Sequence, residues 1–419
     1  MTEREVPMAP GQLEMWHAER TTQSVPDNLY GAIRLHGRLD VKAMERALAA
    51  VVARHEPLRT RMVFDSEPAQ LISDAIPCSM SLIEAADEEE VVKLTRPDAG
   101  TQIHMDAPQL WRIKLMRLPD GDHVLGFVFH HVIMDGWSLS VFFADLSQAY
   151  GQAMAGQDPS LAPLQYTYSD YCREQRRLTG AEEFKDLLAH WRKLLPPALP
   201  ELRLPRDGER TSGTEAHGEA LDAFLDASAT EQMERRARAA RCTLFTLMLD
   251  ASGATLSELG STDDVIIGVP FHNRTKRHLH PLIGCLANDV PMALTGISHR
   301  GTDRDRLDYA KSVTAAALRY PTVPWQLLRR EIYGLTDVAQ YTFCLNVQSP
   351  PDTAYDLVGI EMIDIPMLNE GTMFDFDLTL SRVSDHIEGD LVYASDLYSR
   401  SRAEVLWSGI TSRLLKPAS

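Results

Sequence analysis

The chain has 419 residues, and its 42 lysine and arginine residues against 59 aspartate and glutamate residues give a formal net charge of −17. So acidic a balance argues against a nucleic-acid-binding protein, which needs basic surface to displace counterions from phosphates. Hydrophobic residues at 44% and charged residues at 24% are typical of a folded globular protein, and the length fits two domains better than one.

The first part of the chain alternates helical and strand-like segments. Asp40 is the expected N-cap of an amphipathic helix that begins at Val41. Residues 110–118 and 123–130 predict a β-hairpin around a Pro-Asp-Gly turn, and residues 137–154 return to helical spacing.

A proline-rich stretch, residues 194–217, is the clearest change of composition along the chain and predicts a linker or a wrapping segment. We place the domain boundary shortly before it. The prediction is an N-terminal lobe of residues 1–175 and a C-terminal lobe of residues 176–419 that includes the wrapping linker.

Downstream, Thr230 is the expected N-cap of one helix running to about Leu259, with Gly260 as its stop. The other expected elements are strands at 265–269, 341–347 and 390–394 and helices at 303–318, 324–333 and 401–415. This alternation in both halves predicts an α/β or α+β fold with two similar lobes.

Signals for export, membrane insertion and metal binding are missing from the sequence. No apolar run approaches the roughly 18 residues of a membrane helix, and residues 1–10 lack the apolar region of a secretory signal. The five cysteines are scattered and form no Cys-x-x-Cys pair, which argues against a disulfide framework or a zinc site. We therefore expect no metal and a cytoplasmic location.

One segment stands out chemically, His130-His131-x-x-x-Asp135-Gly136. It predicts a strand, a short loop and the start of a helix. At the strand end His131 can face a cleft, and a neutral imidazole accepts a proton near neutral pH. Asp135 can order the loop, and Gly136 lets a substrate approach the main chain and can offer its N–H to a developing oxyanion.

Two other interpretations of this segment stay open. A metal site is disfavoured because neighbouring residues on a strand point to opposite faces, so His130 and His131 should not bind one ion together. Buried structural histidines are the second alternative. Against both stands the pattern itself, since four fixed positions at this spacing rarely occur together by chance.

The His-His-x-x-x-Asp-Gly segment resembles the signature of the condensation-domain superfamily of nonribosomal peptide synthesis, which includes chloramphenicol acyltransferase relatives and polyketide-associated acyltransferases. Other segments resemble this family's motifs in the same order along the chain: Met8–Trp16, Arg54–Thr60, Tyr168–Tyr171, Gly268–Pro270 with Arg274, Ile283–Asn288 and Phe376–Leu378. The sequence departs from the family pattern at Tyr320–Gln326, at Leu286 and, in part, over Tyr341–Gln348. These departures bear on the choice of substrate and acceptor.

The resemblance implies two chloramphenicol-acetyltransferase-like lobes forming a V-shaped pseudo-dimer with a central tunnel. In the tunnel, His131 would position or deprotonate the nucleophile with Gly136 beside it. Asp135 would support the loop through a salt bridge to Arg274 across the lobes, and His130 would point away as a structural residue. The tunnel walls are expected to include Trp137, Asn346 and Gln348.

The resemblance also implies the reaction and its partners. An amine or hydroxyl acceptor would attack an acyl or peptidyl thioester on a carrier protein, forming an amide or ester in natural-product biosynthesis. No cofactor would be bound tightly, since the substrate would arrive on the phosphopantetheine of the carrier. We expect neither a nucleic-acid nor a membrane partner. Because no carrier-type attachment motif follows, we expect a lone condensation unit, either free-standing or cut from an assembly line.

Two other functions remain as alternatives. One is an acyltransferase of the same superfamily that takes its acyl group from CoA or from a polyketide assembly. The other is a non-catalytic domain that recruits partner enzymes. Arginine clusters at 173–177 and 235–241 could meet a carrier protein or a phosphate, or they could be solvated helix faces.

Overall fold

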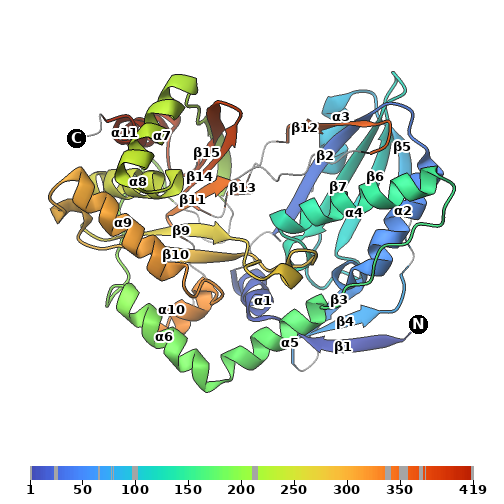
Figure 1. Cartoon of the computed structure of the whole chain (residues 1–419), viewed down its shortest axis with the longest axis horizontal. Coiled ribbons are helices and arrows are strands. Elements are labelled where there is room, and N and C mark those ends of the chain that lie inside the picture. Colours follow the sequence, from blue (N-terminus) through green and yellow to red (C-terminus); the bar gives the residue numbers. More distant parts are fainter. Residues whose placement is uncertain are drawn as a thin grey trace. The chain divides into compact units, whose positions relative to one another are not determined.

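The computed structural model describes residues 2–22, 27–64, 67–76, 78, 80–96, 102–209, 216–335, 341–348, 357–367, 371–372 and 374–416. Two compact units share the chain (Figure 1). The first combines residues 1–181 with 272–287 and 351–367, and the second combines 182–271, 288–350 and 368–419. Relative to the predicted boundary at 175/176, two later segments therefore belong to the first unit.

The first unit is built on a five-stranded sheet of order β12-β2-β7-β6-β5. Neighbouring strands are antiparallel except for β5 and β6, which run parallel. A smaller sheet has the order β1-β4-β3. The strands are β1 Glu3–Pro7, β2 Asn28–His36, β3 Thr60–Val63, β4 Ala69–Ser73, β5 Ser81–Glu84, β6 Trp111–Arg117, β7 His123–His130 and β12 Glu361–Ile365.

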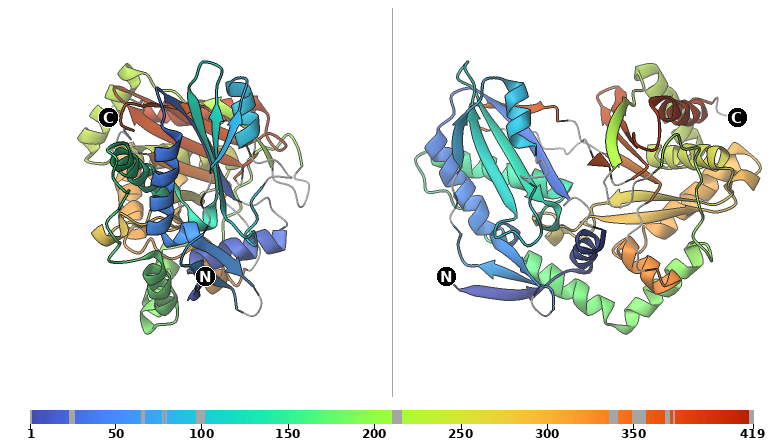
Figure 2. Two further views of the ribbon diagram at one scale, coloured as in Figure 1. Left: turned by 90° about the vertical axis from the view of Figure 1, so that its right-hand side faces the viewer. Right: turned by 180° about the vertical axis from the view of Figure 1, so that it is seen from behind.

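The helices of the first unit are α1 Pro10–Thr22, α2 Val41–Arg54, α3 Glu88–Thr95, α4 Gly136–Met154 and α5 Tyr168–Thr179. α2 and α4 lie against one face of the five-stranded sheet, and α3 covers part of the other face (Figure 1 and Figure 2). Alternation along β7 explains this arrangement. Phe127 and Phe129 meet the rings of Phe143 and Phe142 from α4, at centroid distances of 5.6 and 5.4 Å.

The second unit has a seven-stranded sheet of order β10-β9-β11-β14-β15-β8-β13. Its strands are β8 Ala216–Asp222, β9 Val265–Phe271, β10 Asn288–Leu294, β11 Phe343–Gln348, β13 Gly371–Thr372, β14 Phe376–Val383 and β15 His386–Ala394. Its helices are α6 Glu182–Leu194, α7 Ala227–Ala240, α8 Leu244–Gly260, α9 Asp303–Ala317, α10 Trp325–Tyr333 and α11 Arg400–Leu414. α7, α8 and α11 contact the sheet, α9 packs on α8 and on β10, and α10 also contacts β10.

Most of the predicted elements are confirmed. Asp40 caps α2 by accepting a hydrogen bond from the backbone N–H of Ala43 at 2.9 Å. The predicted hairpin is β6 and β7, and Gly121 in its turn has a φ of +96°, which favours glycine. The mixed α/β class is confirmed as well. The predicted V shape and tunnel concern how the two units are arranged, and they stay predictions.

The single helix expected from Thr230 to Leu259 is wrong. The chain forms α7 and α8 instead, capped by Asp226 and Thr243, whose side chains accept from Ala229 N at 2.8 Å and Thr246 N at 3.1 Å. Between them Arg241 takes a left-handed conformation with φ of 51°. Residues other than glycine seldom adopt that conformation. Because the turn is made by an arginine, with no glycine or proline beside it, the sequence gives no signal that the helix ends there.

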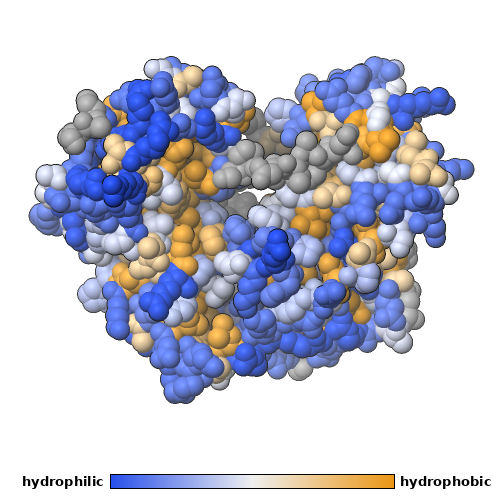
Figure 3. Space-filling model, viewed as in Figure 1, coloured by the Kyte–Doolittle hydropathy of each residue, from blue (hydrophilic) through white to orange (hydrophobic). Residues whose placement is uncertain are grey.

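Residues 195–209 of the proline-rich stretch 194–217 form no helix or strand, whereas Leu194 ends α6 and residues 216 and 217 begin β8. The backbone N–H of Asp207 donates to Leu397 O at 2.8 Å, and the side chain of Asp207 accepts from Ser399 N at 3.1 Å. Residues 210–215 of the predicted linker lie outside the described residues. Figure 3 shows a mainly hydrophilic surface with scattered apolar patches, as expected for packed units of this composition.

Candidate active site

The chemically distinctive segment forms the junction between β7 and α4 in the first unit. β7 ends at His130, residues His131–Ile133 make one 3-10 turn, and α4 begins at Gly136. The buried side chains of Val132, Ile133 and Met134 anchor the turn in the core. The strand, loop and helix expected from the sequence are therefore present.

His130 is fully engaged in structural contacts. Its Nδ1 accepts a hydrogen bond from Val132 N at 3.0 Å, so the neutral ring carries its proton on Nε2, which faces Glu19 Oε2 at 3.2 Å. Burial raises the pKa of Glu19, but the hydrogen bond from His130 and one from Met105 N outweigh burial and lower it. His130 thus fastens the end of β7 to α1.

His131 differs because one of its ring nitrogens is left open. The ring is half-buried, and its Nδ1 lies 3.7 Å from Cys285 Sγ. Within the part of the chain that the structure describes, Nε2 has no hydrogen-bond partner. Burial lowers the pKa of His131, but the carboxylate of Asp27, the contact with Cys285 and the charge of Asp135 outweigh it, so the pKa is raised well above its usual value.

Asp135 is the centre of a buried hydrogen-bond network and is only 1% exposed. Arg274 binds it with both terminal nitrogens, Nη1 to Oδ2 at 2.8 Å and Nη2 to Oδ1 at 3.0 Å. The backbone N–H groups of Ser138, Leu286 and Ala287 donate to it at 2.8, 3.0 and 3.0 Å. Burial raises the pKa of Asp135, but Arg274 and the hydrogen bonds from Ser138 outweigh burial, and the pKa is lowered.

This network explains the role of the Asp135 side chain. Both carboxylate oxygens are occupied by donors, and the lowered pKa keeps the group ionised at neutral pH. Asp135 therefore holds the loop and Arg274 in place and has no lone pair left for moving a substrate proton. Arg274 belongs to the segment 272–287 of the first unit, so both partners of the ion pair lie in the same unit.

Sequence reasoning missed Ser138 and the role of Gly284. Ser138 Oγ accepts from Arg274 Nη2 at 2.8 Å and Gly284 N at 3.0 Å, and faces Asp135 Oδ1 at 2.7 Å. At Gly284 a Cβ atom would lie 2.3 Å from the ring of Tyr168. The position of Ser138 in the sequence was the available signal. It lies three residues after the N-cap Asp135, where the backbone N–H of a helix donates to the side chain of the N-cap residue.

Gly136 and Trp137 form the exposed side of the junction. A Cβ atom at Gly136 would meet no heavy atom within 4 Å, and its backbone N–H makes no hydrogen bond to another described residue. Trp137 is 37% exposed, and its ring stacks on His272 at a centroid distance of 4.9 Å. Its Nε1 donates to His280 O at 3.0 Å, so the loop 272–282 holds the indole.

The other predicted tunnel residues, Asn346 and Gln348, lie on β11 of the second unit. The register places them beside Thr379 and Ser381 of β14. Asn346 is half-buried and Gln348 is exposed. Their assignment to a substrate tunnel stays a prediction.

The Arg54–Thr60 segment serves packing around the junction. Arg54 Nη1 and His55 Nε2 both contact the carboxylate of Asp145 on α4 at 2.6 Å. Glu56 accepts from Ser169 N at 3.0 Å. Burial lowers the pKa of His55 more than Asp145 raises it, so His55 is a structural residue that joins α2 to α4.

The arginine clusters are mostly paired with acids. Arg176 contacts Glu67 at 2.5 Å, and Arg235 contacts Glu231 at 2.6 Å. Arg236 points inward and donates to Leu414 O at 3.2 Å. Both clusters therefore contain structural ion pairs, and their predicted meeting with a carrier protein stays a prediction.

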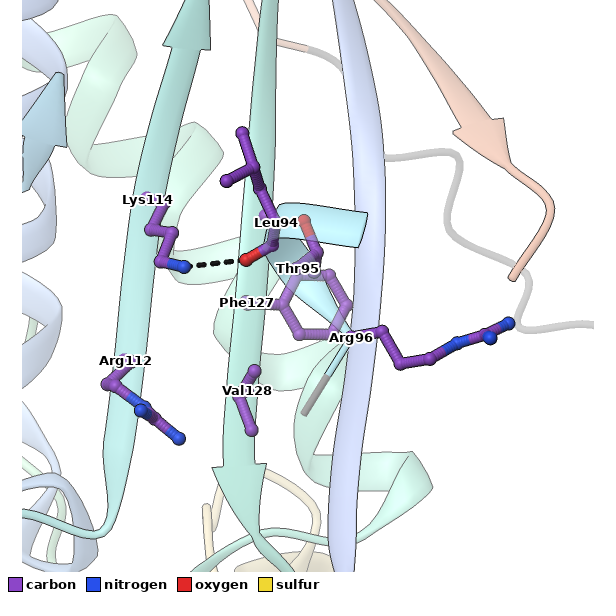
Figure 4. Close-up of a pocket in the computed structure, with 8 residues that line it drawn as sticks. Leu94, Thr95, Arg96, Arg112, Lys114, Phe127 and Val128 are labelled. Atoms are coloured by element: carbon purple, nitrogen blue, oxygen red, sulfur yellow. Dashed lines mark hydrogen bonds between the residues drawn. The ribbon is translucent and has the colours of Figure 1, made fainter. Parts of the chain in front are cut away.

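A small pocket lies away from the junction, where α3 ends over β6 and β7 (Figure 4). Lys114 Nζ donates to Leu94 O there at 2.6 Å. The pocket is lined by Leu94, Thr95, Arg96, Arg112, Lys114, Gly126, Phe127 and Val128. It contains no residue of the His-His-x-x-x-Asp-Gly segment.

Over the described residues, no three side chains of the metal-binding types gather closely enough to hold an ion. All five cysteines are free thiols. None of the helices in the described ranges combines the length and apolar character needed to cross a membrane.

Comparison with known proteins agrees with the motif. A sequence model of the Condensation domain matches residues 2–417. Enniatin synthase of Fusarium equiseti is 29% identical over 400 residues, which cover 92% of this chain and 13% of that protein. Malpinin synthetase of Mortierella alpina is 27% identical over 414 residues, which cover 96% of this chain and 5% of that protein. The chain therefore spans only a small part of these curated relatives.

Solved structures are similar over almost the whole chain. The X-domain from teicoplanin biosynthesis has a TM-score of 0.88 and 28% identity, covering 99% of this chain and 95% of that one. The same domain in complex with OxyB gives 0.87 and 27%, covering 99% and 93%. The condensation domain from Monacolin K polyketide synthase MokA gives 0.81 at 20% identity, covering 99% and 98%, which supports the fold.

Proposed function

The chain belongs to the Condensation domain family, and from this membership we propose that it is an acyltransferase that joins a carrier-bound acyl or peptidyl thioester to an amine or hydroxyl acceptor. One observation supports the proposal above all. His131 presents an unpartnered Nε2, among the described residues, at the same junction where Gly136 leaves its N–H and its side-chain position open. A base and an oxyanion donor that lie near one another are what acyl transfer requires.

In the proposed reaction the acceptor nitrogen or oxygen attacks the thioester carbonyl carbon and a tetrahedral intermediate forms. The acceptor proton passes to His131 Nε2, the C–S bond breaks, and the proton returns to the leaving pantetheine thiolate. General-base help of this kind contributes about 10²–10⁴-fold. The phosphopantetheine arm is part of the substrate and not a resident cofactor.

The two acceptor classes place different demands on His131. An α-amine with a pKa near about 8 already has a usable unprotonated fraction at neutral pH, so His131 would act on it mainly by orientation. A hydroxyl acceptor needs a true base. Replacing His131 should therefore reduce ester formation more than amide formation.

The donor is tested by offering one acyl group on a carrier protein, on CoA and on a small-molecule thioester, and by following the product by mass. Transfer from the carrier alone supports the proposal. Equal or better transfer from CoA would favour the CoA-dependent alternative. His131→Ala is the matched control, and near wild-type turnover of that variant with every acceptor would refute the role of His131.

A recruitment domain is the second candidate function, and the similarity to the X-domain solved with OxyB favours it. The two proposals differ in outcome. No product with any donor, together with tight binding of a second enzyme, would support recruitment. Against it stand the complete motif and the open Nε2 of His131, which a purely docking role does not require.

A further inference from the structure

Cys285 lies between two groups that the proposed reaction does not otherwise connect. Its Sγ is 3.7 Å from His131 Nδ1 and 3.8 Å from the thioether sulfur of Met15 on α1. Both sulfur residues lie within segments that resemble family motifs, Met8–Trp16 and Ile283–Asn288, but the sequence gives neither of them a role. All three belong to the first unit.

Hydrogen bonds from the backbone N–H groups of the residues before and after Cys285 hold it in position. Gly284 N donates to Ser138 Oγ at 3.0 Å, and Leu286 N and Ala287 N donate to Asp135 Oδ2 at 3.0 Å each. The carbonyl of Cys285 accepts from Tyr168 Oη at 3.1 Å. The Asp135 network therefore sets where the sulfur meets the His131 ring, although Asp135 makes no hydrogen bond to that ring.

The three groups restrict where protons can sit. A methionine thioether can only accept, so the contact with Met15 is satisfied only by the thiol proton of Cys285. With its proton directed to Met15, the cysteine sulfur presents a lone pair to His131 Nδ1. In the neutral ring, the proton then belongs on Nδ1 and the lone pair on Nε2.

We propose that Met15 and Cys285 are positioning residues that hold neutral His131 in the tautomer whose Nε2 can accept the acceptor's proton. The opposite arrangement, with the thiol donating to Nδ1, would put the ring proton on Nε2 and remove the base. This inference rests on the proposed function for its kinetic consequence only, because the tautomer is a property of the free protein.

The direct test is ¹⁵N NMR of histidine-labelled protein above the inflection of His131, whose signals are assigned by their loss in His131→Asn. We expect the proton on Nδ1. Met15→Leu keeps the side-chain size and removes the acceptor, and Cys285→Ala removes the sulfur; both should move the ring proton toward Nε2. Cys285→Ser can still donate and accept, and should preserve the wild-type tautomer.

Kinetics with a hydroxyl acceptor provide the second readout. Met15→Leu and Cys285→Ala should lower kcat about tenfold with KM unchanged, the size expected from losing one modest hydrogen bond. Cys285→Ser should recover most of the activity. The controls Cys78→Ala and Met154→Leu lie away from His131 and should change neither measurement.

The outcomes separate this inference from the proposed function. A proton on Nε2 in the wild-type protein, or an unchanged tautomer in both Met15→Leu and Cys285→Ala, would overturn the sulfur arrangement even in an active enzyme. Absence of turnover in the wild-type protein would refute the proposed function, and the NMR result would still decide the tautomer.

Discussion

Loss of the Asp135 carboxylate should destabilise the first unit strongly. In Asp135→Ala the guanidinium of Arg274, itself 1% exposed, would lose its only carboxylate partner in the described structure, and the amides of residues 286 and 287 would lose their acceptor. Breaking a buried pair by removing one partner costs about 3–5 kcal/mol. For a unit of this size that corresponds to a fall in Tm of roughly 6–20 °C.

The assay is urea unfolding of the wild-type protein, Asp135→Ala, Arg274→Ala and the double variant. The double variant should cost less than the sum of the single variants by about 2–3 kcal/mol, because it leaves no unpaired charge. Glu182→Ala, which removes one partner of an exposed pair with Lys185, is the matched control and should change little. Additive losses, or a fully stable Asp135→Ala protein that is inactive, would refute the view of Asp135 as a structural residue.

Acid should remove the same stabilisation. Because the folded pKa of Asp135 is lowered, its contribution is present above the unfolded pKa near 3.8 and disappears as pH falls through the folded pKa. The difference in unfolding free energy between wild-type protein and Asp135→Ala should therefore shrink as the solution is acidified below that value. A difference that is constant with pH would contradict the assignment.

Three further outcomes test the site. Because the pKa of His131 is raised and its neutral form is the proposed base, kcat/KM with a hydroxyl acceptor should rise with pH through an inflection above 6.5; a rate that falls over that range would contradict the assignment. Gly136→Ala should leave thermal unfolding unchanged, since its Cβ meets nothing, yet lower kcat/KM by about tenfold or more if substrate passes there; unchanged kinetics would place the substrate elsewhere. Gly284→Ala, whose Cβ would lie 2.3 Å from the Tyr168 ring, should cost about 1–3 kcal/mol in urea unfolding, whereas Gly11→Ala, with open space around it, should cost much less.

Local patterns predicted the elements around the site well. The apolar spacing after Asp40 and the Pro-Asp-Gly turn between β6 and β7 are short-range signals, and the structure has both elements. The contact between Asp135 and Arg274 came from the family resemblance and not from spacing. The interrupted helix at Arg241 was missed because its turn uses a residue that rarely marks one.

The other residues of the site could not be predicted from local patterns, because they are far apart in sequence and come together only in the folded chain. Cys285 is separated from His131 by 154 positions and from Met15 by 270. A lone cysteine in an apolar run is typical of a core residue, and a methionine in α1 is typical of packing. Only the folded chain shows that the two sulfur atoms meet beside His131.

The return of residues 272–287 to the first unit has a consequence for recombining such proteins. This stretch leaves the second unit after β9, delivers Arg274, Cys285 and the amides that bind Asp135, and re-enters the second unit at β10. A hybrid joined near residue 181 would take His131 and Asp135 from one parent and Arg274 and the amides that bind Asp135 from the other. A hybrid that keeps the Asp135 network intact should therefore take residues 272–287 from the same parent as residues 1–181.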